Sequence, residues 1–201
     1  MKSPKTLLLA AALSCFAYSA SGQTIFEMST VSGSTFEHDS DGTNNPSPLP
    51  NAGSEATAGG VFSWGNLLTD TTPNTATFSG TTFTSTDWGG NGTYTSTTIS
   101  INTLSSVTIN AVGNIASSDL GSDTFNFFYQ LDDGSQISFA DTLSNLNVAG
   151  IDNLIVGFTY NMNGASDIVT VSELSVVPEP GTYALLSGIC ALGFVMLNRR
   201  N

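Results

Sequence analysis

The sequence predicts an all-β fold, an antiparallel β-sandwich, from three observations. Apolar and polar residues alternate along several segments between residues 61 and 177, which is the period of a strand with one buried face. β-Branched and aromatic residues dominate from Asn74 to Val176, and no proline occurs there. Outside the two terminal segments, no window of helical length shows a 3.6-residue period. We therefore expect about eight to ten strands in two packed sheets.

Five segments carry the alternation. They place these residues on the core face: Ile99 and Ile101; Val107, Ile109 and Ala111; Phe125, Phe127, Tyr129 and Leu131; Leu154, Val156, Phe158 and Tyr160; Val169, Val171, Leu174 and Val176. Phe128 breaks the pattern of its segment, and a slip of phase near Ser172 predicts a β-bulge. The Asp133-Gly134 pair predicts a hairpin, because this dipeptide accepts the positive φ of tight hairpin turns.

Turn-forming residues separate and precede these strands. The stretches "WGGNGT", "SSDLGSD" and "NMNGASD" are expected to be turns, the first including Asn91-Gly92-Thr93. Residues 23–60 form a loop-rich N-terminal segment, with a short strand near Thr24–Ser29 and no regular structure from Asp39 to Gly60. The sandwich domain is then expected over residues 61–177.

Charges are distributed very unevenly along the chain. The four basic residues lie at the two ends, and none occurs from Gln23 to Val177, whereas all but one of the sixteen acidic residues lie in that range. Such a body repels phosphate groups, so a nucleic-acid partner is excluded. Both cysteines, Cys15 and Cys190, lie in terminal apolar runs, so the body has no disulfide, thiol nucleophile or thiolate metal site.

Residues 1–22 have the layout of a secretory signal peptide. Two lysines precede the apolar stretch Leu7–Ala17, and small residues follow it, so we expect a signal helix cleaved by signal peptidase after Gly22. Two alternatives stay open: a buried first helix, or a lipoprotein with Cys15 as its acceptor. The residue three positions before that cysteine is Ala12, not the usual leucine.

Residues 178–201 form a second targeting segment. An uncharged, mostly apolar run, Tyr183–Leu197, is near the length of a transmembrane helix when counted from Gly181. Arginines after it would hold its end on the cytoplasmic side. The segment begins with Pro178, Glu179 and Pro180 and ends with Arg199, Arg200 and Asn201. These three parts, in this order at the C-terminus, resemble the PEP-CTERM sorting signal of exported bacterial proteins.

That resemblance implies a Gram-negative host that makes exopolysaccharide, and an exosortase as processing partner in the membrane. It also implies a chain that is anchored transiently in the inner membrane by its C-terminal helix. The tail is then removed at or near the motif, which leaves the protein at the cell surface or outside the cell.

Residues 92–139 resemble a recurring module of exported bacterial proteins that carry C-terminal sorting signals. The pattern D-x-F-x-F-x-Y-x-L-D-x-G is matched by Asp123, Phe125, Phe127, Tyr129, Leu131, Asp132 and Gly134. The resemblance implies a jelly-roll-like sandwich with a link to carbohydrate or matrix. An Asp-Asn pair usually introduces the closing strand of the module, and Asp167-Ile168 stands there instead, which weakens any site inferred at that position.

Calcium is the candidate cofactor. The loop "DSDGTNN" offers Asp39, Asp41, Thr43 and Asn44 as the oxygen ligands that Ca²⁺ prefers. The loop lacks the bidentate glutamate of an EF-hand, and the alternative is a loop that only turns. The acidic pairs Asp119 with Asp123 and Asp132 with Asp133 carry the same two interpretations.

Two aromatic residues and one histidine complete the candidates. Trp88 borders a glycine-rich turn and is the candidate for stacking on a glycan, whereas Trp64 is expected in the core. His38 is the only histidine of the chain, and no nucleophile elbow accompanies it, so catalysis by a serine–histidine triad is not expected.

Three functions follow from these features. The first is an exported surface or matrix protein without enzymatic activity, associated with exopolysaccharide or biofilm. The second is a carbohydrate-binding module for surface glycans, which an aromatic-lined concave face would favour over a flat face rich in serine and threonine. The third is a glycan-active hydrolase, which needs two carboxyl groups about 5 to 9.5 Å apart in a cleft.

Overall fold

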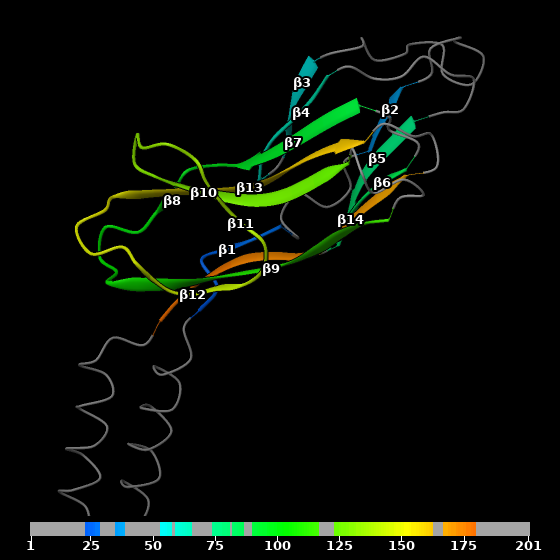
Figure 1. Cartoon of the computed structure of the whole chain (residues 1–201). Coiled ribbons are helices and arrows are strands. Elements are labelled where there is room, and N and C mark those ends of the chain that lie inside the picture. The colour runs from blue at the N-terminus through cyan, green and yellow to red at the C-terminus, as the bar shows by residue number, and fades with distance from the viewer. Residues whose placement is uncertain are drawn as a thin grey trace, which may run out of the picture.

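The structure is a computed structural model, and it describes residues 23–28, 35–38, 53–57, 59–65, 74–80, 82–86, 90–116, 123–162 and 167–179. Within these ranges the chain forms two seven-stranded antiparallel sheets that pack face to face (Figure 1). The predicted all-β sandwich is therefore confirmed. The expected signal peptide (1–22) and transmembrane run (Tyr183–Leu197) lie outside the described residues, and no helix in the described part is long and apolar enough to span a membrane.

Sheet A contains the last strand of the domain near its middle. Its strand order is β12-β9-β14-β6-β5-β2, and β1 also pairs with β14. The strands are β1 (Phe26–Glu27), β2 (Thr35–His38), β5 (Asn74–Ser79), β6 (Thr82–Thr86), β9 (Ser106–Ala116), β12 (Leu143–Asn147) and β14 (Ile168–Pro178). Strand β1 falls inside the short strand predicted near Thr24–Ser29.

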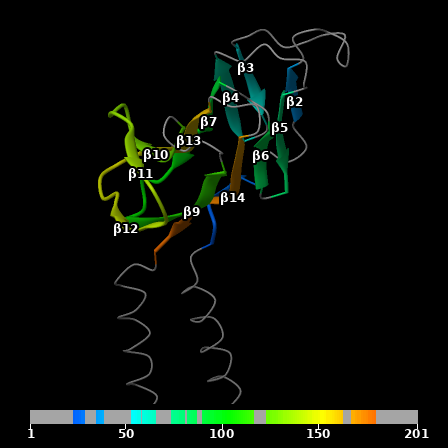
Figure 2. The ribbon, with the colours of Figure 1, turned by 45° about the vertical axis from the view of Figure 1, so that its right-hand side comes forward.

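Sheet B has the order β11-β10-β13-β7-β4-β3, and β8 also pairs with β13. Its strands are β3 (Gly53–Thr57), β4 (Gly60–Gly65), β7 (Gly90–Ser96), β8 (Ile99–Ser100), β10 (Thr124–Leu131), β11 (Ile137–Phe139) and β13 (Asn153–Met162). Strands β3 and β4 of this sheet lie at the same end of the sandwich as β2 and β5 of sheet A (Figure 2).

The path between the sheets is that of a jelly roll. Strands β6, β9, β12 and β14 belong to sheet A in the order β6-β14-β9-β12, and β7, β10, β11 and β13 belong to sheet B in the order β7-β13-β10-β11. From β6 onward the chain crosses between the sheets after β6, β8, β9, β11, β12 and β13. The four strands of sheet A and the four of sheet B just named therefore make two interlocked Greek keys. The other strands widen both sheets beyond this frame.

Aromatic rings fill much of the space between the sheets. Phe83 of β6 lies at the centre, with its ring centroid 4.8 Å from that of Phe78 and 4.9 Å from that of Phe158 across the sandwich. Such pairs add to stability beyond the area they bury. The residues that alternation placed inward are all in this core. Most are buried, and Phe125, Tyr129 and Leu131 are half-buried against it. Trp64 is also buried there, as predicted.

The break in alternation at Phe128 has a specific cause. Phe128 is on the outer face of sheet B, opposite Gly157 of β13, and yet it is only 2 % exposed. A Cβ at position 157 would lie 2.5 Å from Cζ of Phe128, so the ring occupies the space above the glycine. An aromatic ring that covers a cross-strand glycine is a known way to stabilise a sheet where a side chain is missing.

The expected bulge and hairpin are both present. The pairing of β14 with β9 shifts register between Val171 and Glu173, which confirms the bulge near Ser172. Strands β10 and β11 pair as a hairpin, with Tyr129 opposite Ile137. The left-handed residue of its loop is Asp132, at φ 46°, whereas Gly134 has no positive φ, so the detail of the turn was wrong.

Two glycine-rich stretches that were expected to be irregular are strands. Residues 53–57 form β3, and residues 91–93 lie inside β7, so these expectations were wrong. Gly92 faces the core, where a Cβ would lie 2.3 Å from Cζ of Tyr160. The glycine therefore serves close packing of a ring against the strand and not a change of chain direction.

We predict a loss of stability at alkaline pH that depends on two core tyrosines. Burial raises the pKa of Tyr94 and Tyr160, and at Tyr160 a hydrogen bond to Ser85 partly opposes the rise. The unfolded phenols ionise near pH 10, so the contribution of these two tyrosines to the free energy of unfolding should be constant below about pH 10 and fall above it. Urea titrations at pH 8 and pH 11 would measure this fall.

Tyr160→Phe should make the fall between these two pH values smaller. At pH 8 it should cost about 1 kcal/mol, because the variant lacks the 3.2 Å bond to the buried Ser85 hydroxyl. Tyr129→Phe, at a half-buried tyrosine, is the control. An unchanged fall in Tyr160→Phe would show that this phenol does not link folding to pH.

Candidate functional site

The described residues reach the first two positions of the predicted sorting motif. Pro178 is the last residue of β14, and Glu179 follows it directly. The remaining motif positions Pro180, Arg199 and Arg200 lie outside the described residues. So do the calcium candidates Asp39, Asp41, Thr43 and Asn44 and the glycan candidate Trp88, and these stay predictions.

The start of the motif is part of sheet A. Pro178 pairs with Val107 of β9, and the amide of Glu179 donates a 3.1 Å hydrogen bond to the carbonyl of Ser106. Both residues are half-buried. Pro178 is tolerated at this place because it is the final residue of the strand, where a missing N–H costs least.

The side chain of Glu179 extends across β9 to the edge strand β12. Its Oε1 accepts a 2.5 Å hydrogen bond from the hydroxyl of Thr108 and a 2.8 Å hydrogen bond from the amide of Asn145. The pairing of β12 with β9 is irregular between Leu143 and Leu146, and Asn145 has φ 57° there. Asparagine tolerates this left-handed conformation better than most residues. The amide at this bulge is thus available to the carboxylate instead of to the ladder.

Neither Thr108 nor Asn145 was identified from the sequence. Thr108 has the ordinary position of an outward residue between the core residues Val107 and Ile109. The one local signal is the asparagine in "LSNLN", a turn-forming residue within an otherwise alternating segment. A contact that joins residues of β9 and β12 to the residue after β14 cannot be read from any one of these segments.

Comparison with known families identifies the segment that begins here. Residues 176–200 match the family described as the PEP-CTERM protein-sorting motif. The predicted sorting signal is confirmed. The motif indicates an exported protein that is anchored transiently at the membrane, and it implies processing by an exosortase during export. No curated protein matches the chain.

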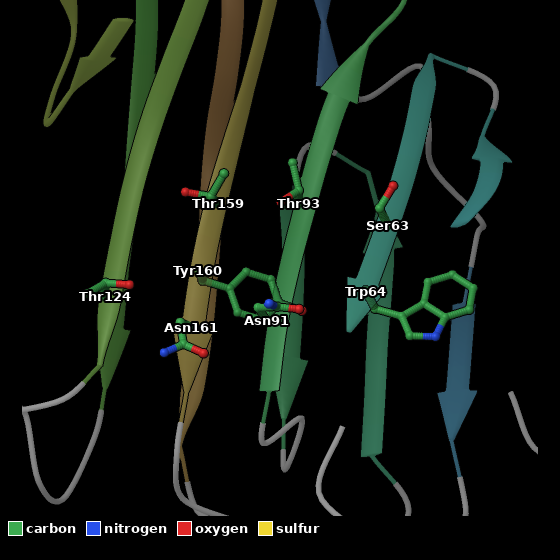
Figure 3. Close-up of a pocket in the computed structure, with 8 residues that line it drawn as sticks. All are labelled: Ser63, Trp64, Asn91, Thr93, Thr124, Thr159, Tyr160 and Asn161. Carbon is green, nitrogen blue, oxygen red and sulfur yellow. The ribbon is translucent and has the colours of Figure 1, made fainter. Parts of the chain in front are cut away.

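A second feature is a shallow depression of about 350 Å³ on the outer face of sheet B (Figure 3). Ser63, Thr93 and Thr159 lie side by side on β4, β7 and β13, and a second row joins Asn91, Asn161 and Thr124. Trp64 and Tyr160 also line it, but both are nearly buried, at 5 % and 2 % exposed. Hydroxyl and amide groups therefore dominate this surface, and no lining residue is charged.

The acidic loop between β10 and β11 has a structural role for one of its carboxylates. Oδ1 of Asp132 accepts hydrogen bonds from the amides of Asp152 and Asn153, at 3.1 and 2.9 Å. These bonds join the hairpin loop to the start of β13, and the amide of Asp132 adds a bond to the carbonyl of Asn153. No group of three histidine, cysteine or acidic side chains that could hold a metal ion occurs in the described part of the chain.

We expect Asp132→Ala to destabilise the domain by about 1–3 kcal/mol. The variant removes the acceptor of two hydrogen bonds. It also places alanine at a positive φ, which aspartate and asparagine tolerate better because their side chains form local hydrogen bonds. Asp132→Asn should recover part of the loss, since asparagine keeps an oxygen acceptor and tolerates this conformation. Asp133→Ala, at the exposed neighbour, is the control and should change stability by less than about 0.5 kcal/mol. Thermal and urea unfolding would measure all three, and equal effects at the two aspartates would contradict the assignment.

Proposed function

We propose that the protein is an exported cell-surface or extracellular-matrix protein without enzymatic activity, which associates with exopolysaccharide or biofilm. The observation that carries this proposal is the continuity of the sorting motif with β14. The β-sandwich is joined to the sorting segment without a linker, since Pro178 is both the end of a strand and part of the matched segment. The sandwich is thus the cargo that the sorting motif delivers.

The surface chemistry of the cargo supports the same proposal. The outer face of sheet A carries a regular array of hydroxyl groups: Thr75, Thr77, Thr82, Thr84, Thr86 and Thr170. The rows of sheet B add serine, threonine and asparagine. Such uncharged donors and acceptors match the hydroxyl groups of polysaccharides. Binding through these groups also needs no lysine or arginine, which residues 23–177 lack.

A carbohydrate-binding module is the second candidate, and the depression on sheet B is the feature that favours it. Its two rows of Ser, Thr and Asn side chains could bind one neutral glycan chain across β4, β7, β13 and β10. Hydroxyl and amide groups dominate this face of sheet B, which favours passive association over stacking of a glycan on an aromatic ring. Trp88 stays the candidate for such a platform.

The test compares recovery of the protein from a host that has an exosortase, with and without exopolysaccharide synthesis. We expect the processed protein to co-purify with the polysaccharide, and to move into the free medium when synthesis is deleted. Free protein in both strains would contradict matrix association. Release of new reducing ends from the purified polysaccharide would contradict the absence of enzymatic activity.

A pair of matched variants separates the two candidates. Thr93→Ala with Asn161→Ala alters the depression, whereas Thr77→Ala with Thr84→Ala alters the outer face of sheet A. A binding module should lose roughly fivefold or more in polysaccharide affinity in the first variant only, because each lost hydrogen bond contributes about 1 kcal/mol. A passive matrix protein should show small and similar losses in both.

A further inference from the structure

We infer that the folded body holds the glutamate of its own sorting motif in a latch, and that this latch limits the rate of processing. The latch is formed by Thr108 and Asn145, which both donate hydrogen bonds to the carboxylate of Glu179. This inference rests on the sorting motif and is independent of the proposed matrix role.

The first argument is that the backbone at the motif is already paired. Pro178 is in register with Val107, and the Glu179 amide is bonded to the carbonyl of Ser106. Enzymes and domains that recognise an extended peptide pair with its main chain and hold alternate side chains in pockets. A partner that binds residues 178–179 in this way must first separate them from β9.

The second argument is that the carboxylate is occupied as well. The two donors of the latch come from two strands, the hydroxyl from β9 and the amide from the bulge of β12. A carboxylate that accepts two short hydrogen bonds forms one of the stronger polar contacts in proteins. Recognition of Glu179 by a second protein therefore competes with an intramolecular site that is always present.

The consequence is an equilibrium between a latched and a released end of β14. If only the released form is processed, the observed rate is proportional to the released fraction. Release exposes little of the core, because Val176 is the last buried apolar residue before the motif, while Val177, Pro178 and Glu179 are only half-buried. The two hydrogen bonds of the latch, together with the backbone hydrogen bond of the Glu179 amide, thus make a large part of the free-energy difference between the latched and released forms.

The test follows conversion of the full-length precursor by pulse-chase labelling in a host that contains an exosortase. Thr108→Val keeps the size and branching of the side chain and removes the hydroxyl. We expect it to speed processing by about tenfold, the effect of losing one hydrogen bond to a charged acceptor. Thr108→Ser retains the donor and should be processed like the native chain. Thr84→Val, at an outward threonine of β6, controls for the general effect of such a change in sheet A.

A second measurement examines the latch itself, in full-length precursor purified in detergent. The amide of Asn145 should exchange slowly with deuterium in the native chain and faster in Glu179→Ala, which removes its acceptor. Equal exchange in the two chains would overturn the latch. Slow native exchange with no acceleration of processing in Thr108→Val, or with slower processing, would overturn its control of the rate. Neither result would alter the test of polysaccharide association, so the two proposals fail separately.

Discussion

Strand β14 is the element on which the rest of the sandwich depends. It is the last of the described strands but is interior in sheet A, where it pairs with β9 along its length and with β6 and β1 on the other side. Its inward residues Val169, Val171, Leu174 and Val176 are all buried. The two halves of sheet A consequently cannot be joined until β14 is available. The first described strand, β1, likewise finds its partner only in the last one, which makes this a fold of long-range contacts.

The absence of lysine and arginine from residues 23–177 explains how carboxylates are stabilised in this protein. In most domains an acidic side chain can pair with a neighbouring cation, and here there is none. The two carboxylates with the clearest contacts, Asp132 and Glu179, use backbone amides and a hydroxyl instead. Both contacts lie where the regular ladder is interrupted: Asp132 is in a hairpin loop and binds amides at the start of β13, and Glu179 binds an amide at the bulge of β12.

Much of the fold could be predicted because alternation is a local signal. The inward residues of β9, β10, β13 and β14 and the bulge near Ser172 followed from the period alone. Glycine was where the predictions failed, since the sequence does not say whether a glycine turns the chain or makes room for a ring. Gly92 and Gly157 make room for Tyr160 and Phe128, and both rings come from other strands. The sorting motif could be identified from its order of residues, whereas its contacts with Thr108 and Asn145 depend on the tertiary fold.

The position of the motif at the end of a central strand reconciles two requirements, a stable cargo and a removable tail. Among the described residues, the buried apolar side chains run from Phe26 to Val176, so this core is complete before the motif begins at Pro178. The amide of Ile25 donates a 2.9 Å hydrogen bond to the carbonyl of Val176, and the ends of the domain therefore meet in one sheet. The predicted cleavage after Gly22 and the processing at the motif both act beyond this meeting point. Removal of both segments would leave the pairing of β1 with β14 in sheet A intact.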